Sequence, residues 1–308
     1  MVDILMATYN GEKYIKEQIE SILNQTYKDW ILYIRDDGSK DNTKSIINDY
    51  CKRYPKKIIH VKDNKVGLGA KLNFAELMKY SKSEYCMFAD QDDVWLNTKI
   101  EDTMNKMIDA EHIHGKKIPI LVHTDLKVVD GNLNIINESF WKYQNLNKDN
   151  KSLNTLLVQN NITGCTMMMN KSLVKLGVKV PKDCIMHDWW VGLIASGLGK
   201  IYTVDKPTML YRQHGNNEVG AHKYNSIQFI RKKAKNIDKI NKRIDEGILQ
   251  ASAFYDQYKE KLNESNRNTV YNFSQLRKKC VIERKLSIIR NKFFKSGLIR
   301  NISYFILI

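Results

Sequence analysis

The feature that most constrains the fold is an alternation of short apolar runs with amphipathic segments in residues 1–95. Four runs have the length and composition of buried strands, at residues 2–7, 30–34, 57–61 and 85–89. Between them, Ile15, Ile19 and Ile22 recur at helical spacing, Asp41 is suited to cap a second helix, and residues 70–80 form a third. This alternation predicts an α/β protein with a mostly parallel sheet flanked by helices.

Residues 118–215 have a more mixed pattern. Strand candidates lie at residues 120–129, 162–169, 201–204 and 209–212. We expect them to extend the sheet with antiparallel strands.

The C-terminal part of the chain is basic and amphipathic. After Pro207 there is no proline, and a first helical stripe consists of Ile227, Ile230, Ala234, Ile237, Ile244 and Ile248. A second stripe consists of Ile282, Leu286, Ile289 and Phe293. Residues 223–308 hold 20 Lys or Arg and 7 Asp or Glu, so they carry +13 of the chain's net charge of +16. We therefore expect a basic helical extension over residues 222–308.

The cysteines and the apolar segments indicate the cellular compartment of the protein. The five cysteines are scattered, with no CxxC pair, so neither a zinc site nor a disulfide framework is indicated. No window has the roughly 18 apolar residues that a membrane span needs. The chain begins directly with an apolar strand rather than a secretory leader, which predicts a cytoplasmic protein.

The run Asp90-Gln91-Asp92-Asp93 follows the apolar strand candidate at residues 85–89. Neighbouring carboxylates repel one another and raise each other's pKa, so such a cluster favours a bound cation. Oxygen ligands of this kind suit Mg²⁺ or Mn²⁺. The alternative interpretation, a capped helix start near Thr98, explains the same residues equally well.

The run Asp36-Asp37-Gly38-Ser39 ends the second strand candidate with residues typical of turns. In a parallel sheet, ligands bind beyond the carboxyl ends of strands, where both acidic runs are expected. A carboxylate there is suited to accept the N3–H of a pyrimidine while Tyr9 packs on the ring. A simple turn is the alternative.

Together these motifs resemble the family 2 glycosyltransferases of GT-A fold over residues 2–215. The resemblance is carried, in order, by Ala7-Thr8-Tyr9-Asn10-Gly11, Gln25-Thr26-Tyr27, residues 36–43, residues 67–74 and Asp90-Gln91-Asp92-Asp93. Residues 187–190 and 211–217 resemble the bacterial rhamnosyltransferase branch. The resemblance implies a Rossmann-like GT-A catalytic domain at residues 1–221, with a nucleotide-binding half at 1–95 and an acceptor half at 96–221.

The resemblance also implies an inverting, metal-dependent enzyme. Its donor is expected to be dTDP-rhamnose, or alternatively a UDP-sugar, and its acceptor a cell-surface polysaccharide or lipid-linked glycan. The donor residues implied are Thr8, Tyr9, Asn10, Asp36, Asp37, Lys71, Asn73, Asp90 and Arg212. The metal ligands implied for Mg²⁺ or Mn²⁺ are Asp92 and Asp93, and His214 is expected either to complete the metal shell or to contact a phosphate.

Asp188 matches the general base of the family, which takes the proton of the attacking acceptor hydroxyl. Its neighbours His187, Trp189 and Trp190 are expected to bind the acceptor, because tryptophan stacks on the apolar face of a sugar. The alternative from the residues alone is a helix cap followed by two core tryptophans.

The basic extension has three interpretations. Cationic residues beside apolar stripes favour adsorption to an anionic membrane, which would place the enzyme peripherally on the inner face of the cell membrane. The same stripes suit a homodimer interface, and a solvated basic face needs no partner.

Other protein classes fit less well. The charge suggests a nucleic-acid binder, but it is concentrated in the tail, and the acidic runs would repel a phosphate backbone. A sugar nucleotidyltransferase needs a Gly-rich basic loop after the first strand, which Asn10-Gly11-Glu12-Lys13 does not provide. A nicotinamide dehydrogenase would have a GxGxxG motif after the first strand, and none follows Ala7 in this chain. A UDP-hexose-dependent enzyme and a non-catalytic basic nucleic-acid- or membrane-binding protein remain as alternatives.

Overall fold

The computed structural model describes residues 1–215, 220–221 and 237–308. The chain forms two compact units. Unit 1 comprises residues 1–140, 162–180 and 199–221, and unit 2 comprises residues 141–161, 181–198 and 222–308. The end of the predicted catalytic domain at residue 221 is also a unit boundary, and two earlier segments belong to unit 2 as well.

The first half of the sheet in unit 1 is parallel, as the alternation predicts. It contains β1 (Val2–Thr8), β2 (Trp30–Asp36), β3 (Ile58–His60) and β4 (Tyr85–Asp90), in the spatial order β3-β2-β1-β4. In this register Thr8 is opposite Asp36 and Ala7 is opposite Asp90. The carboxyl ends of β1, β2 and β4 therefore meet at one edge of the sheet.

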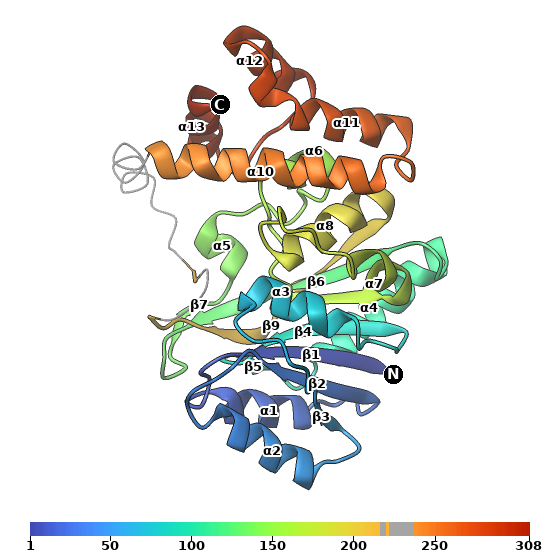
Figure 1. Ribbon diagram of the computed structural model, residues 1–308, viewed down its shortest axis with the longest axis vertical. Helices are drawn as coiled ribbons and strands as arrows, with labels where there is room; N and C mark the ends of the chain where they lie inside the picture. The colour runs from blue at the N-terminus through green and yellow to red at the C-terminus, as the bar shows by residue number, and fades with distance from the viewer. Residues whose placement is uncertain (216–219, 222–236) are drawn as a thin grey trace. The chain divides into compact units, whose positions relative to one another are not determined.

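Helices cover both faces of these strands. Figure 1 shows α1 (Ile15–Leu23) and α2 (Thr43–Arg53) on one face and α3 (Gly69–Met78) on the other. Right-handed crossovers require this arrangement, because α3 returns the chain from β3 across to β4. The N-cap residue of α2 is Asn42, and the Asp41 carboxylate accepts the Thr43 N–H at 3.0 Å.

The rest of the sheet mixes directions. β8 (Met167–Asn170) pairs antiparallel with β4 and β6 (Ile120–Val129), and β9 (Lys200–Arg212) runs parallel to β6. The short strands β5 (Val94–Trp95) and β7 (Ile135–Asn137) complete nine strands among the described residues. The other elements of this half are α4 (Lys99–His114), α7 (Lys171–Gly177) and the 3-10 turn Gly164–Thr166.

Two strand predictions need correction. Residues 162–166 are not a strand, because the chain forms a 3-10 turn at Gly164–Thr166 before β8 begins. The two expected strands at 201–204 and 209–212 are one strand, β9, which passes through Pro207. The register against β6 shifts at this point, and such an irregularity accommodates a proline that has no N–H to donate.

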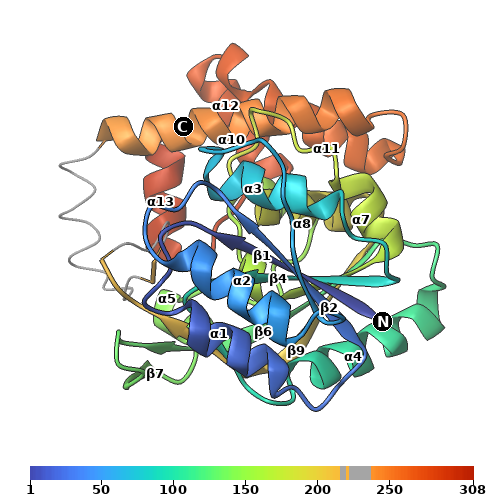
Figure 2. The same ribbon diagram turned by 60° about the horizontal axis from the view of Figure 1, so that its bottom comes forward.

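Unit 2 is helical. Its elements are α5 (Phe140–Gln144, of which Phe140 belongs to unit 1), α6 (Leu153–Val158), α8 (His187–Leu198), α10 (Ile237–Tyr258), α11 (Glu264–Ser274), the 3-10 turn Leu276–Lys278, α12 (Val281–Arg290) and α13 (Leu298–Leu307). Figure 2 shows the same helices from another side. The helical tail is confirmed for residues 237–308, whereas Ile227, Ile230 and Ala234 lie outside the described residues. No described helix is both long and apolar enough to span a membrane.

Candidate active site

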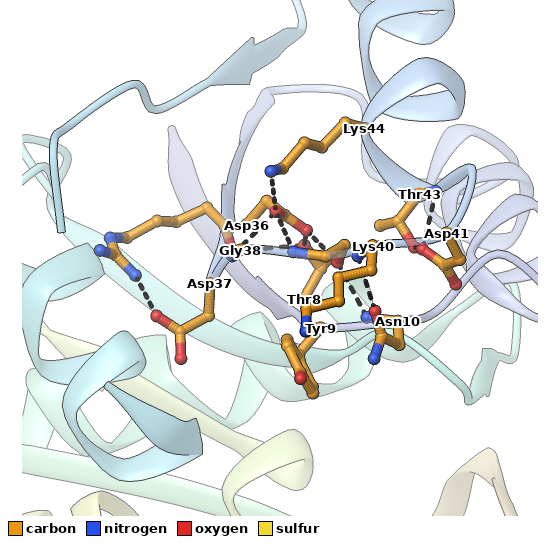
Figure 3. A network of polar contacts seen from close by, with 12 residues as sticks. Thr8, Tyr9, Asn10, Asp36, Asp37, Gly38, Lys40, Asp41, Thr43 and Lys44 are labelled. Atoms are coloured by element: carbon orange, nitrogen blue, oxygen red, sulfur yellow. Dashed lines mark hydrogen bonds and ion pairs between the residues drawn. The ribbon is translucent and has the colours of Figure 1, made fainter. Parts of the chain in front are cut away.

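The turn after β2 fixes the side chain of Asp36. Its Oδ1 accepts the N–H groups of Gly38 at 3.0 Å and Ser39 at 2.8 Å, and its Oδ2 accepts the Thr8 hydroxyl at 3.2 Å. Gly38 has a φ of +96°, which a residue with a side chain rarely adopts. Figure 3 shows this network, with Lys44 approaching the carboxylate from α2. Asp36 therefore serves mainly to hold the turn.

Asp37 faces the first turn of α3. Its Oδ1 accepts the Leu68 N–H at 3.0 Å and its Oδ2 accepts the Gly69 N–H at 2.8 Å. The partial positive charge of a helix N-terminus favours a carboxylate there. Lys71, another predicted donor residue, lies half-buried in the same turn of α3.

A buried arginine, Arg35, contacts Asp37 and holds it in place. Arg35 is 1% exposed; its Nη1 lies 3.3 Å from Asp37 Oδ1 and donates to Asn73 Oδ1 at 3.0 Å. Its Nε and Nη2 form a bidentate pair with Asp63, both at 2.9 Å. The hydrogen bond from Arg35 lowers the pKa of Asp63. Asn73, predicted to bind donor, is thus 2% exposed and holds Arg35.

The loop after β1 presents Tyr9 to solvent. The Tyr9 side chain is 53% exposed, and Asn10 adopts a positive φ of 47°. Asn10 is held by Ser39, whose Oγ accepts its N–H at 2.8 Å, and its Oδ1 accepts the Lys40 N–H at 2.9 Å. Thr8, Tyr9, Asn10 and Asp37 therefore come together, as the sequence predicts.

Gln91 clamps this loop to the turn after β4. Its Oε1 accepts the Tyr9 N–H and its Nε2 donates to the Tyr9 carbonyl, each at 2.9 Å. Gly11 makes the clamp possible, because a Cβ at that position would lie 2.2 Å from Gln91 Oε1. Gln91 is a site residue that the sequence motifs alone do not identify. Its position between two predicted ligand carboxylates was the available signal.

In the turn after β4, Asp92 meets His214. Asp92 Oδ2 and His214 Nε2 are 2.7 Å apart, although 122 residues separate them, and each side chain is 15% exposed. The His214 ring stacks on Tyr14, with ring centroids 5.0 Å apart. The structure thus brings two of the three predicted metal ligands together.

Arg212 connects the elements that carry this pair. It is 2% exposed; its Nε donates to the Asp92 carbonyl at 2.8 Å and its Nη1 donates to the Gly131 carbonyl at 2.7 Å. Nη2 contacts Glu17, and the guanidinium lies over the Tyr14 ring. The guanidinium predicted to face a diphosphate is therefore engaged by protein groups and fixes the end of β9.

Asp93 points into the interior. It is fully buried, and its Oδ1 accepts the Arg212 N–H at 3.2 Å. Burial raises the pKa of Asp93 well above its usual range, and the charges of Asp92 and Asp90 raise it further. Oxygen atoms of Asp90 and Asp93 and the sulfur of Cys165 lie within 4.8 Å of one another. Burial also raises the pKa of the Cys165 thiol. The cluster of Asp90, Asp93 and Cys165 therefore offers few anionic ligands to a metal ion.

The remaining predicted residues lie in unit 2. Asp188 is half-buried in the first turn of α8, and its Oδ1 accepts the Trp189 N–H at 2.5 Å. Trp189 is also half-buried and donates from Nε1 to the Leu156 carbonyl at 2.6 Å. Trp190 is fully buried and packs edge-on against Phe254.

His187 is 4% exposed at the start of α8. Burial lowers the pKa of its imidazole to about 3. His187 and Trp190 are therefore core residues, whereas Asp188 and Trp189 are half-buried. Asn216 and Asn217, which complete the second resemblance motif, lie outside the described residues.

The family profile described as Glycosyl transferase family 2 matches residues 3–177, more than half of the chain. The chain belongs to glycosyl transferase family 2. It is a glycosyltransferase, and the family resemblance of its motifs is confirmed.

Two curated proteins are similar to this chain in sequence. The dTDP-rhamnosyl transferase RfbG of Shigella flexneri is 30% identical over 246 residues, which cover 74% of this chain and 80% of that protein. The UDP-Glc:alpha-D-GlcNAc-diphosphoundecaprenol beta-1,3-glucosyltransferase WfgD of Escherichia coli is 26% identical, covering 56% of this chain and 62% of that protein.

A solved structure shares the fold. The mannosyltransferase PcManGT of Pyrobaculum calidifontis, in complex with GDP-Man and Mn²⁺, has a TM-score of 0.58 at 11% identity, covering 94% of this chain and 72% of that one. This likeness, together with the sheet described above, confirms the GT-A fold predicted for this family 2 member.

Proposed function

We propose that this family 2 enzyme transfers L-rhamnose from dTDP-rhamnose, with inversion and with the help of Mn²⁺ or Mg²⁺, to a cell-surface or lipid-linked glycan. The observation that carries the proposal is the Asp92–His214 pair beside the exposed Tyr9 loop, at the edge where β1, β2 and β4 end. The choice of rhamnose is supported by the 30% identity to a dTDP-rhamnosyl transferase.

The residues present fit a divalent cation. Neighbouring ligands of an octahedral ion with bonds near 2.1 Å lie about 3.0 Å apart, close to the 2.7 Å between Asp92 Oδ2 and His214 Nε2. Both side chains are partly exposed, which leaves room for phosphate oxygens and water. Mixed carboxylate and imidazole ligands favour Mn²⁺ over Mg²⁺. Such an ion neutralises charge on a diphosphate leaving group.

We assign recognition of the pyrimidine to the β1 and β2 ends. Asp37 is held by two N–H groups and Arg35, so its carboxylate has a fixed orientation and spare acceptor capacity for the N3–H of a base. The exposed ring of Tyr9 supplies the stacking surface. Asp36 and Arg212 act as positioning residues, because protein groups engage the polar atoms of both.

In the transfer itself, we assign the base role to Asp188. The acceptor oxygen forms a bond to C1 of the sugar while the bond from C1 to the diphosphate breaks, and the hydroxyl proton passes to the Asp188 carboxylate. The support for Asp188 is its place in the first turn of α8 with a half-buried carboxylate. Trp189 is proposed to contact the acceptor, and His187 and Trp190 to support the turn from the core.

The experiment that tests the donor is a calorimetric titration of the full chain with dTDP-rhamnose, UDP-glucose, dTDP and UDP, each with Mn²⁺ and with EDTA. We expect metal-dependent binding that is strongest for dTDP-rhamnose. A preference for UDP-glucose would overturn the rhamnose assignment and leave the site assignment in place. Equal binding with Mn²⁺ and EDTA would overturn the metal assignment.

The base assignment predicts that Asp188→Asn lowers kcat by about 10²–10⁴-fold, the usual contribution of a general base. Donor affinity should change little, because the substitution removes only the proton acceptor. Rates are to be measured at saturating donor beside calorimetric donor affinities. The matched control is Asp183→Asn, an exposed carboxylate close to α8 in the chain. Survival of turnover in Asp188→Asn would contradict the assignment.

A second candidate, a UDP-hexose donor, is favoured by the likeness to the UDP-Glc-dependent enzyme WfgD. Asp37 would meet the same N3–H in uracil and thymine, so the donor titration separates the two candidates.

A further inference from the structure

The last two described helices expose two apolar rows. On α12, Ile282, Leu286 and Ile289 are 72%, 43% and 53% exposed. On α13, Leu298, Ile302 and Ile306 are 74%, 50% and 67% exposed. Each row recurs at intervals of three or four residues, so each lies along one side of its helix. We call these six residues the apolar rows.

The opposite sides of the same helices are tied into unit 2. Ile288 is 1% exposed, Tyr304 is 3% exposed, and Arg300 donates to the carbonyls of Asn145 and Gln144. The orientation of α13 is therefore fixed by packing and hydrogen bonds. The apolar rows are the outward sides of two anchored helices rather than frayed ends.

Basic residues are frequent in the segment that carries the apolar rows. Residues 275–308 contain nine Lys or Arg and one Glu, a net charge of +8. Arg290 and Lys292 are exposed in the segment that joins the two rows. Lys285 lies 5.4 Å from the Phe305 ring, so the two helices approach one another at a cationic contact. Exposed apolar residues within a strongly basic surface are complementary to an anionic lipid bilayer.

We propose that the apolar rows and the basic residues around them form a docking surface for an anionic membrane. The apolar side chains enter the acyl boundary while Arg290 and Lys292 contact lipid phosphates. A second copy of this chain is the less favourable occupant, because it would bring together two segments that each carry a net charge of +8. This proposal does not depend on the donor or on the identity of the transferred sugar.

The test is co-flotation of the full chain with vesicles of phosphatidylglycerol and phosphatidylethanolamine, compared with pure phosphatidylcholine vesicles. We expect binding to the anionic vesicles only. The triple variant Ile282→Ser, Leu298→Ser, Ile306→Ser should lower the partition coefficient by about tenfold or more. A matched triple variant, Val66→Ser, Ile113→Ser, Leu249→Ser, removes apolar residues elsewhere that are each more than half exposed and should bind as the wild type does.

Charge variants measure the electrostatic contribution to membrane binding. Arg290→Gln and Lys292→Gln should each weaken binding by about fivefold at low salt. In a second measurement, a tryptophan placed by Leu298→Trp should be quenched by brominated acyl chains, and one placed by Ile113→Trp should not.

Three results would overturn the proposal. One is wild-type binding by the apolar-row variant, and another is the absence of wild-type binding to anionic vesicles. The third is a dimer in light scattering that the apolar-row variant alone dissociates, because a second copy would then be the occupant. Each readout is independent of sugar transfer, so failure here is distinguishable from failure of the proposed function.

Discussion

The two acidic turns of unit 1 look alike in sequence and differ in how their carboxylates are satisfied. After β2, Asp36 and Asp37 accept backbone N–H groups from their own turn and from α3, and Arg35 lies beside Asp37. After β4, Asp92 faces His214, and Asp93 is buried with its pKa raised well above its usual range. A turn whose charges are already compensated is a scaffold. A turn that gathers neighbouring carboxylates beside a histidine is suited to a cation.

The largest expected effect follows from the second turn. Asp92→Asn should lower kcat/KM by about a thousandfold, because a catalytic metal contributes several kcal/mol of charge stabilisation. The measurement is a rate titration with Mn²⁺. In contrast, Asp36→Asn should leave the half-saturating Mn²⁺ concentration unchanged. A similar shift in both variants would abolish the distinction between the turns.

The first turn is expected to contribute to stability instead. Arg35→Leu leaves the carboxylates of Asp37 and Asp63 without their buried cation and should lower the free energy of unfolding by about 3–5 kcal/mol. Urea denaturation measures this change. Lys44→Met is the control, because Lys44 is half exposed and 3.6 Å from Asp36, so its loss should matter by less than about 0.5 kcal/mol. Equal effects of the two variants would show that Arg35 is not the support of the turn.

Gln91 joins the turn after β4 to the Tyr9 loop and gives a smaller expected effect. Gln91→Ala removes both hydrogen bonds to Tyr9 and should weaken dTDP or UDP binding by about tenfold at saturating Mn²⁺. Gln91→Glu keeps an acceptor for the Tyr9 N–H but cannot donate to the Tyr9 carbonyl, so its calorimetric affinity should be intermediate. Wild-type affinity in both variants would mean that the Tyr9 loop holds its conformation without the clamp.

The smallest effect is the pH dependence of the Arg35–Asp63 pair. The pKa of Asp63 is lower in the folded protein than in the unfolded chain. Its stabilising contribution is therefore full above the unfolded pKa of about 3.9 and is lost as the pH falls through the folded pKa. Asp63→Asn should lower the unfolding free energy by about 1 kcal/mol at pH 7 and by almost nothing near pH 2.

Asp49→Asn is the matched control, since this carboxylate is 64% exposed and 3.7 Å from Arg53. Its urea midpoints should follow the wild type across the pH range. A constant difference between Asp63→Asn and wild type from pH 7 to pH 2 would contradict the assignment.

Much of the fold was predictable because its pattern is local. Buried parallel strands are continuous apolar runs, so β1, β4 and β6 match their predicted positions to within about a residue. The prediction failed at residues 162–166, where apolar and small residues suit a strand and a turn equally. The prediction of two separate strands failed at Pro207. Proline has no N–H to donate, but the register between β6 and β9 shifts at this point, so the strand continues without that hydrogen bond.

The candidate site was predictable in its positions and not in its orientations. The sequence gives no sign that Asp92 faces His214 while Asp93 points inward. Arg212 at the end of β9 fixes these orientations, because its backbone N–H donates to Asp93 and its Nε donates to the Asp92 carbonyl. Arg35, Tyr14 and Gln91 were missed for the same reason. Their partners are set by strand order rather than by neighbours in the chain.

The close approach of Gln91 to Gly11 also has an evolutionary consequence. Any side chain at position 11 would collide with the Gln91 carboxamide, and shortening residue 91 alone would release the Tyr9 loop. A lineage that changes one position should therefore change the other. The two sites are expected to vary as a pair among descendants of this sequence, although three helices and three strands separate them along the chain.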